Sequence, residues 1–507
     1  MGLNNESRTA NVGRNAVSAI SNKIIILVLT FVSRKFFIQY IGVEYLGING
    51  LFSNVLTLLS MADLGLGTAM NVSLYKPIAE NDTAKISALL NYFKRLYVYI
   101  GIAVTVIGLS LLPALPVLVN MDSSIPHLYL YYLVFVAKNA VSYLFIHKSS
   151  LLRADQKTYV INKIEVYINI IRVIVQICII VMIHSYLLYI LMETIQVLLL
   201  NILVSREADK QYPFLDSKYS LSKREKKLIF SDISSVFLYK ISFSLINGTD
   251  NILMSMIVGT IYVGLYSNYY TITSNIEIII SLIFTSLTAS IGNLVATSSS
   301  KHNYRIFKSM QMVGFWFCGI ICVCLFWLTQ DFITLWIGKG MQLDNLTLIA
   351  IVLNVFFSTC MRPVWTFREG TGMYRQIRYI MVVTAVLNIV LSIILGPYLG
   401  VAGILFATSI SKLLTYFWYE PYVLFKKVFN AKPYKYYFEY LTNGIVLVIS
   451  GIVCFYLTNW IVVDSWIKWL TKAGVCFLCI NIIYFLRYFK TEEFNNMLQK
   501  VRVIMKR

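Results

Sequence analysis

The feature that most constrains this chain is a series of long apolar runs separated by short polar segments. A membrane-spanning α-helix needs about 20 consecutive, mostly apolar residues, and about fourteen such runs follow one another along the 507 residues. Only 13% of the residues are charged, whereas about a quarter are charged in soluble domains. The sequence therefore predicts an all-α integral membrane protein. The predicted spans are residues 20–40, 50–74, 96–119, 128–147, 160–183, 187–205, 229–258, 263–294, 310–336, 346–367, 377–395, 401–422, 440–460 and 466–487.

The distribution of basic residues predicts the orientation of these spans. The formal net charge is +20, which in a soluble protein would suggest nucleic-acid binding. Here Lys and Arg cluster in alternate loops, with Lys339 and Lys468 as the clearest exceptions, and basic loops mark the cytoplasmic side of a membrane. We therefore expect a multi-pass membrane protein with both termini in the cytoplasm and no nucleic-acid partner.

Cysteine and histidine do not form a metal-binding pattern. All eight cysteines fall inside apolar runs, where a free cysteine behaves as a small hydrophobic residue. The four histidines are scattered, so we expect neither a metal site nor a cofactor. The first apolar run follows Arg8, Arg14 and Lys23 and lacks a small-residue cleavage site, so it is expected to remain as the first span.

A short motif occurs twice, at equivalent places in the predicted topology. Residues 42–47 read GVEYLG and residues 259–264 read GTIYVG, each at the outward turn of the first hairpin of a six-helix half. Six helices separate the two copies, which gives both halves the same orientation and implies a parallel repeat. The predicted domains are, in order, an N-lobe at 1–206, a cytoplasmic linker at 207–227, a C-lobe at 228–425, and two final helices with a cytoplasmic tail at 426–507.

Ionisable residues occur at membrane depth in both halves. A charge at the bilayer centre costs at least about 2.5–3.5 kcal/mol on insertion scales, so such groups face a partner or water. Cations there indicate an anionic ligand, because Lys and Arg bind phosphate through charge-assisted hydrogen bonds. The candidate substrate-binding cations are Arg34, Lys138, Arg172, Lys240, Lys412 and Arg362. The candidate ion-coupling acids are Asp63, Glu193, Asp250 and Glu277. Arg34 and Arg362 lie nearer the ends of their spans, where extension towards the interface is the alternative.

Other polar residues accompany these charges at helical spacing. Residues three and four apart share one face of a helix, and a polar face on a spanning helix meets water or a polar helix contact rather than lipid. Two explanations stay open: a hydrated cavity, or structural pairs such as Arg172 with Glu193 and Lys240 with Glu277. The clearest such stripe lies on the span 160–183 and consists of Asn162, Glu165, Asn169, Arg172 and Gln176.

Several motifs, in order along the chain, give the sequence a family resemblance. They are 43–54 (VEYLGINGLFSN), 61–67 (MADLGLG), 152–159 (LRADQKTY), Arg362-Pro363 with Phe367-Arg368 and Gly372, 400–403 (GVAG) and 418–421 (WYEP). Over essentially its whole length the chain resembles Wzx-type oligosaccharide flippases, which belong to the polysaccharide transporter family of the multidrug/oligosaccharidyl-lipid/polysaccharide exporter superfamily.

This resemblance implies a V-shaped transporter of two lobes in the bacterial cell (cytoplasmic) membrane. Such a protein flips undecaprenyl-diphosphate-linked oligosaccharide repeat units outward for capsule or exopolysaccharide synthesis, by alternating access and alongside a polysaccharide polymerase and other assembly proteins. The six cations named above are candidates for the diphosphate by their chemistry and depth, not by an exact family motif. The resemblance implies that the chain is not an enzyme.

The sequence also bears on the energy source and on the alternatives. It contains no G-x-x-x-x-G-K-[ST] nucleotide-binding loop, so a gradient of H⁺ or Na⁺ acting through the acids is the expected energy source. A cation-coupled multidrug exporter of the same superfamily is the first alternative, although it usually has twelve helices and takes cationic drugs. A membrane polysaccharide polymerase is the second, although such enzymes carry a large outward loop and the outward loops predicted here are short.

Overall fold

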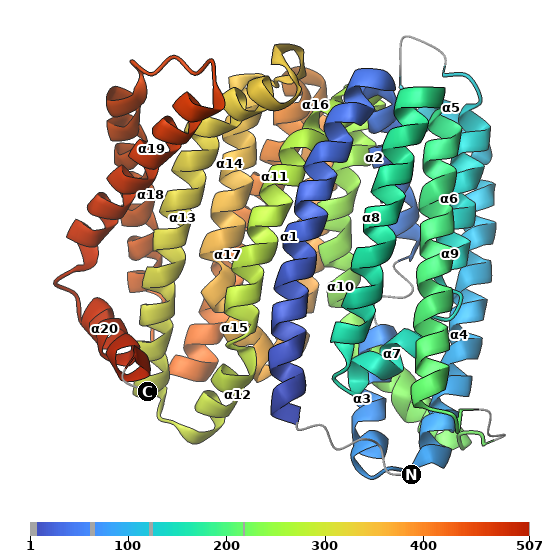
Figure 1. Ribbon diagram of the computed structural model, residues 1–507. Coiled ribbons are helices and arrows are strands. Elements are labelled where there is room, and N and C mark those ends of the chain that lie inside the picture. Colours follow the sequence, from blue (N-terminus) through green and yellow to red (C-terminus); the bar gives the residue numbers. More distant parts are fainter. Residues whose placement is uncertain (1–7, 61–65, 121–124, 216–218, 506–507) are drawn as a thin grey trace. The chain divides into compact units, whose positions relative to one another are not determined.

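The computed structural model describes residues 8–60, 66–120, 125–215 and 219–505, with some side chains excepted, chiefly those of 8–20, 227–240 and 499–505. Across these ranges the secondary structure is helical and contains no strand (Figure 1). Contacts between Cα atoms divide the chain into two compact units, Met1–Gly264 and Leu265–Arg507. The predicted all-α class is confirmed, and the predicted division into lobes, linker and final helices stays a prediction.

In the first unit, helices that are close in sequence also pack together. α1 packs on α8, α8 on α9, and α6 on α9, while α2 lies against α10. A buried apolar cluster from α3, α4 and α7, which includes Phe93, Tyr97 and Leu151, forms a core at one end of the unit. The helices are α1 (Arg8–Tyr40), α2 (Val43–Leu59), α3 (Leu66–Ala79), α4 (Thr83–Ser110), α5 (Leu115–Leu118), α6 (Leu128–Ser142), α7 (Ile146–Ala154), α8 (Thr158–Ile183), α9 (Tyr186–Gln211) and α10 (Lys223–Ile257).

The second unit is organised around α13, which packs against α14, α18, α19 and α20. More than half of the apolar part of α13 is buried by these neighbours. α14 also packs on α16, and α12 packs on α15. The helices are α11 (Thr260–Thr285), which begins in the first unit, α12 (Thr288–Thr297), α13 (Ser300–Ile337), α14 (Asn345–Cys360), α15 (Arg362–Thr371), α16 (Tyr374–Leu414), α17 (Tyr416–Leu424), α18 (Tyr434–Thr458), α19 (Trp466–Tyr488) and α20 (Glu492–Met505).

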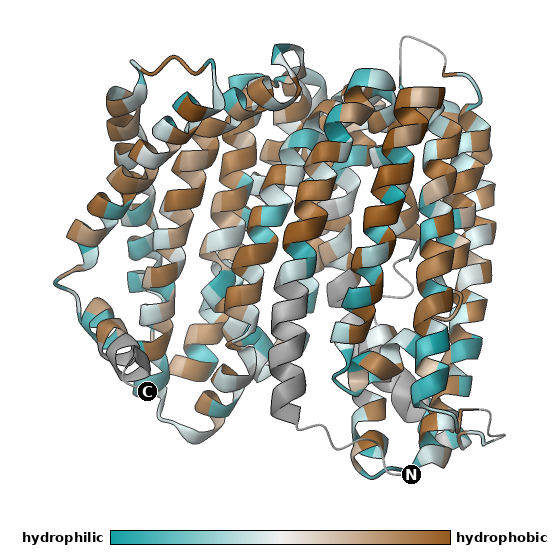
Figure 2. Ribbon diagram, viewed as in Figure 1, coloured by the Kyte–Doolittle hydropathy of each residue, from teal (hydrophilic) through white to brown (hydrophobic). Residues whose placement is uncertain are grey.

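Many of these helices are long and apolar enough to cross a bilayer. Within the described ranges there are eight such segments, or ten when two bent pairs each count as one span. The bent pairs are α6 with α7, at 46°, and α14 with α15, at 41°. The second bend lies where Pro363 follows Arg362, because proline lacks the N–H needed for the helical ladder. Figure 2 shows long apolar stretches along helices such as α8 and α13, with hydrophilic residues gathered mainly towards helix ends.

One of the eight segments, Tyr374–Phe429, contains two of the predicted spans. The chain departs from helical geometry at Gly400, with φ 57° and ψ −136°, a conformation open mainly to glycine. Asn388 donates a hydrogen bond to Thr408, at 2.7 Å, and the hydroxyls of Thr384 and Thr415 lie 2.6 Å apart. Residues 20 or more apart in a straight helix would be separated by about 30 Å or more. These contacts therefore show that the chain reverses at Gly400, as the separate predicted spans 377–395 and 401–422 require.

Candidate functional site

An ion pair joins two of the predicted site residues in the first unit. Lys138 lies on α6 and Glu193 on α9, and Lys138 Nζ is 2.7 Å from Glu193 Oε2. The two side chains are 25% and 17% exposed. Opposite charges in contact lower the cost of holding each at membrane depth. The remaining exposure leaves both groups open to exchange with solvent or a ligand.

A second cation, Arg172, is held on the neighbouring helix α8 by its own stripe of polar residues. Its Nη1 donates to Gln176 Oε1 at 2.9 Å and its Nη2 to Asn169 Oδ1 at 3.4 Å. Gln176 in turn donates to the backbone carbonyl of Tyr189 on α9, at 3.0 Å. The Gln176 end of the stripe predicted on span 160–183 thus contacts α9, whereas its Glu165 accepts a hydrogen bond from Asn22 on α1, at 2.9 Å. Neutral amides leave the positive charge of Arg172 uncompensated by these contacts.

Tyr189 connects the charges of the first unit. Its hydroxyl interacts electrostatically with Glu193 on its own helix and with Arg172 and Arg34 from α8 and α1. Glu193 also interacts with Arg172 as well as Lys138. Arg34 and Arg172 therefore lie near the Tyr189 phenol, and Lys138 and Arg172 lie near the Glu193 carboxylate. We call this group of five residues the N-unit cluster.

Aromatic rings border the N-unit cluster on α1, α2, α6 and α9. Tyr186 lies 4.9 Å from Tyr45 and 4.9 Å from Tyr131, measured between ring centroids, and Tyr189 lies 4.8 Å from Phe37. Tyrosine presents both an apolar ring and a polar tip. Charges beside such rings suit a ligand that combines a charged group with a sugar or apolar face.

In the second unit, Glu277 and Arg362 lie near one another. Ser358 on α14 donates a hydrogen bond from its hydroxyl to Glu277 Oε1 on α11. Arg362 begins α15, one turn after Ser358, and its guanidinium lies 5.1 Å from the centre of the Trp365 ring. Glu277 and Glu369 are the acids that act most strongly on Arg362. We call Glu277, Ser358 and Arg362 the C-unit cluster.

Lys412 occupies a more closed position than the other cations. Its side chain on α16 is 8% exposed, and its Nζ lies 3.4 Å from Asn354 Oδ1 on α14. Asn354 also donates to the backbone carbonyl of Leu405, at 2.8 Å. Lys412 thus sits in the packed contact between α14 and α16, where a ligand reaches it only if these helices separate.

The structure gives less detail about the surroundings of the remaining predicted site residues. Asp250 lies on α10 with 8% of its surface exposed, on a different helix from Glu193. Lys240 is also on α10, but its side chain lies outside the described residues, as does the whole of Asp63. Within the described part of the chain, no three His, Cys, Asp or Glu side chains are placed to hold a metal ion.

Sequence patterns missed the most deeply buried ion pair described in the protein. Arg368 on α15 bonds both carboxylate oxygens of Glu420 on α17, at 3.1 and 3.2 Å, with side chains 5% and 2% exposed. A second acid, Glu369, lies 3.2 Å from Arg368, whose guanidinium is also 5.8 Å from the Trp365 ring. Both partners of the main pair lie in motifs that carry the family resemblance. Their pairing, however, depends on helix packing that no local pattern specifies.

The four-residue spacing along the sequence could have identified two further site residues. Tyr189 precedes Glu193 by four residues, and Ser358 precedes Arg362 by four. Residues four apart lie on the same helical face, so each was a candidate neighbour of its charge. The structural pair suggested for Arg172 and Glu193 is replaced by the contact of Lys138 with Glu193, because α6 rather than α8 brings its cation within hydrogen-bond distance of the carboxylate.

Comparisons with solved structures identify the fold. The chain is similar to the lipid II flippase MurJ in an inward closed conformation, with a TM-score of 0.68, 17% identity, and 94% of this chain and 98% of that chain covered. It is similar to an inward-facing multidrug resistance MATE family transporter of the MOP superfamily, with a TM-score of 0.61, 16% identity, and coverage of 79% and 95%. A MOP superfamily transporter from Pyrococcus furiosus gives a TM-score of 0.53, 14% identity, and coverage of 80% and 93%.

The chain has the fold of these transporters. This confirms the predicted multi-pass membrane protein and the coarser part of the predicted resemblance, namely a likeness to flippases and exporters of this superfamily. No protein-family model matches the chain, and no curated protein matches it by sequence. At these identities the likeness concerns the fold, and the cargo has to be inferred from the chain's own residues.

Proposed function

We propose that this chain is a flippase that carries undecaprenyl-diphosphate-linked oligosaccharide units from the inner to the outer leaflet of a bacterial cytoplasmic membrane, with both termini in the cytoplasm. The observation that carries the proposal is the N-unit cluster at membrane depth, in which Lys138 and Arg172 act on Glu193 and Arg34 acts on the adjoining Tyr189. Three cations and one carboxylate in this cluster leave an excess of positive charge, which favours an anionic cargo over a cationic one.

A diphosphate would enter the N-unit cluster by competing with Glu193 for Lys138. Phosphate oxygens accept charge-assisted hydrogen bonds from Lys and Arg, and Lys138 already holds a carboxylate in that position, at 2.7 Å. Arg172 is bound by neutral amides, so its charge remains available to the cargo. The adjoining tyrosine rings, Tyr45 and Tyr186, would then lie beside the first sugars.

This exchange also suggests how an ion gradient could act. When the diphosphate takes Lys138, the Glu193 carboxylate loses its partner, and an unpaired carboxylate at membrane depth takes up a proton or a cation. Departure of the cargo lets Lys138 return and expels that ion. Glu193 is accordingly the first candidate for coupling to H⁺ or Na⁺, with Glu277 in the C-unit cluster as the second.

A complementation experiment tests the proposal. Cells that lack the gene should accumulate lipid-linked oligosaccharide that is inaccessible to a membrane-impermeant sugar-modifying reagent, and the wild-type chain should relieve this. Lys138→Gln should not relieve it. The matched control is Lys148→Gln, since Lys148 also forms an ion pair, at 2.6 Å, but with Asp209, whose side chain is 50% exposed.

Two results would contradict the proposal. One is a deletion strain with no accumulation and an intact output of surface polymer. The other is full complementation by a chain in which Arg34, Lys138 and Arg172 are all replaced by Gln and which is inserted normally.

A multidrug exporter is the second candidate, and the position of Glu193 near Tyr186 and Tyr189 is the observation that favours it, because cations bind carboxylates and aromatic faces. The same strains distinguish the two functions. Hypersensitivity of the deletion strain to lipophilic cations, relieved by Lys138→Gln but not by Glu193→Gln, would favour drug export, because a cationic drug needs the acid and not the lysine.

A further inference from the structure

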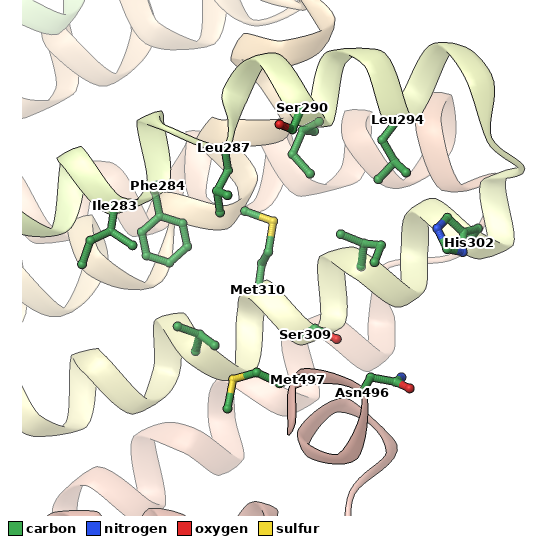
Figure 3. A pocket seen from close by; sticks show the side chains of 13 residues that line it. Ile283, Phe284, Leu287, Ser290, Leu294, His302, Ser309, Met310, Asn496 and Met497 are labelled. Carbon is green, nitrogen blue, oxygen red and sulfur yellow. The ribbon is translucent and has the colours of Figure 1, made fainter. Parts of the chain in front are cut away.

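An apolar groove crosses the surface of the second unit, and its lining includes no residue of the C-unit cluster. It has a volume of about 460 Å³ and lies between α11–α12, α13 and α20. Figure 3 shows Phe284, Leu287 and Met310 turned towards its interior, with Met497 of α20 along one side. The rim is exposed: Ile283 and Leu287 retain 41% and 39% of their surface.

One end of the groove is polar. His302 and Asn496 lie there (Figure 3), and Lys301 is the exposed neighbour of His302. α13 begins at Ser300, so its positive dipole end is also at this place. Asn496 Nδ2 is buried and has no hydrogen-bond partner within the described part of the chain. A buried amide donor normally has a partner, which indicates that a ligand's acceptor atom belongs there.

The length of the groove fits one leaflet of a bilayer. Its α13 wall runs from His302 to Val313, which at 1.5 Å per residue is about 17 Å. Half of the roughly 30 Å hydrocarbon core is about 15 Å. The polar end lies beside residues 301–305, a basic segment that the sequence places on the cytoplasmic side.

α20 is fixed along one side of the groove by charge and by ring packing. Glu493 Oε1 lies 2.5 Å from Lys308 Nζ, and Glu492 Oε1 lies 3.2 Å from Arg305 Nε, both on α13. Phe494, 8% exposed, packs its ring 6.2 Å from that of Trp316. These contacts neutralise Arg305 and Lys308, whereas the structure records no ion pair for Lys301, the exposed neighbour of the groove residue His302, within the described part of the chain.

We propose that this groove is a binding site for an anionic phospholipid of the inner leaflet, with an acyl chain against Leu287 and Met310 and the headgroup region at Lys301, His302 and Asn496. When the partly buried Asn496 side chain turns its amide into the groove, Nδ2 donates to a phosphate or ester oxygen, and Lys301 supplies the charge that favours an anionic headgroup. The site holds a resident membrane lipid and not the transported cargo, so it stands whether or not the proposed function holds.

Lipid retention tests the site. The full chain is purified, exposed to vesicles of phosphatidylglycerol and phosphatidylethanolamine in equal parts, and washed in detergent, and its bound lipids are counted by native mass spectrometry. We expect one retained phosphatidylglycerol in the wild type. Leu287→Trp places an indole in the groove and should abolish that retention. Equal retention of the two lipids, or none, would overturn the proposal.

A second apolar groove provides the matched control. It lies between α14, α16–α17 and α18, has a volume of about 530 Å³ and contains Ile449, which is 49% exposed. Ile449→Trp should leave phosphatidylglycerol retention unchanged, and an equal loss in both variants would locate the lipid elsewhere. The thermal unfolding midpoint of each variant in detergent verifies that it is folded.

A separate variant tests the proposed contact between the lipid headgroup and the polar end of the groove. A basic side chain near a membrane surface contributes about 1 kcal/mol of attraction to anionic lipid, which corresponds to about a fivefold change in binding. Lys301→Gln should therefore lower phosphatidylglycerol retention about fivefold and leave phosphatidylethanolamine unaffected. Unchanged preference for phosphatidylglycerol would refute the assignment of the polar end.

Discussion

Gly47 and Gly264 lie in direct contact, so the last residues of the two copies of the repeated motif meet. A Cβ atom added to Gly264 would lie 3.0 Å from Gly47 N and 2.3 Å from the carbonyl oxygen of Val43. A Cβ atom added to Gly47 would lie 2.2 Å from the carbonyl oxygen of Thr260. The first glycines of the motifs, Gly42 and Gly259, both have positive φ, at 107° and 133°. The two copies therefore share a backbone role: each turns the chain and then lets α2 and α11 approach closely.

This contact gives the first prediction. Gly47→Ala should destabilise the protein by about 1–3 kcal/mol, the usual cost of overpacking a close contact, because the nearest atom is a backbone carbonyl oxygen of Thr260, which cannot turn away as a flexible side chain can. The measurement is the thermal midpoint of the detergent-solubilised chain, followed by size-exclusion chromatography. Gly444→Ala is the control: Gly444 lies within α18 with no neighbouring atom near its missing side chain, so alanine should be neutral or slightly stabilising.

The second prediction concerns the Lys138–Glu193 pair. Lys138→Met leaves Glu193 without its closest partner and should cost between about 1 and 3 kcal/mol, between the values for exposed and fully buried pairs. Adding Glu193→Gln to Lys138→Met should restore much of that stability, since the double variant has no unpaired charge. Denaturation of all four chains in the same detergent measures the coupling, and strict additivity of the two single effects would contradict the pairing.

The third prediction concerns Arg368 and Glu420, the pair with side chains 5% and 2% exposed. Arg368→Met should destabilise the chain by about 3–5 kcal/mol, because Glu420 is left charged and buried. The comparison is Lys148→Met, whose partner Asp209 is 50% exposed and whose loss should cost under about 1 kcal/mol. Similar unfolding midpoints for these two variants would show that Arg368 and Glu420 do not form the buried pair.

The fourth prediction is a pH dependence of the attachment of α20. Partial burial is the largest single influence and would raise the pKa of Glu493, but the hydrogen bonds to Lys308, to its own backbone N–H and to Thr491, with the charge of Lys308, together lower the pKa below the ordinary 4.5. A carboxyl whose pKa is lower when docked stabilises docking above its ordinary pKa and loses that contribution as the pH falls through the lowered value. α20 should therefore remain attached at pH 6 and loosen as the pH falls below the ordinary carboxyl pKa of 4.5.

A fluorescent label on a cysteine replacing the exposed Asn495, in a Cys178→Ser background, reports this change, since Trp316 quenches it only while α20 is docked. Glu493→Gln should remove the pH dependence. Persistence of the transition in that variant would assign it to other groups nearby, such as Glu492 or Glu439.

The apolar runs predicted most of the helices that can span a membrane. The span 310–336 lies within α13, and 160–183 lies within α8. The polar stripe on α8 was also predictable, because helical spacing alone puts Asn169, Arg172 and Gln176 on one face. The reversal at Gly400 appeared in the sequence as a gap between two runs. The resemblance to flippases led to the superfamily whose fold the structure has.

The sequence by itself determined the class of the protein, because hydropathy and helical periodicity are properties of single segments and act before any packing. Only the tertiary structure decided which charges meet: Lys138 rather than Arg172 contacts Glu193, Lys412 is closed between α14 and α16, and Arg368 finds Glu420. Such pairings depend on the rotation and depth of each helix against its neighbours. Those are set by close packing at many positions together, such as the contact of Gly47 with Gly264, and a one-dimensional pattern does not contain them.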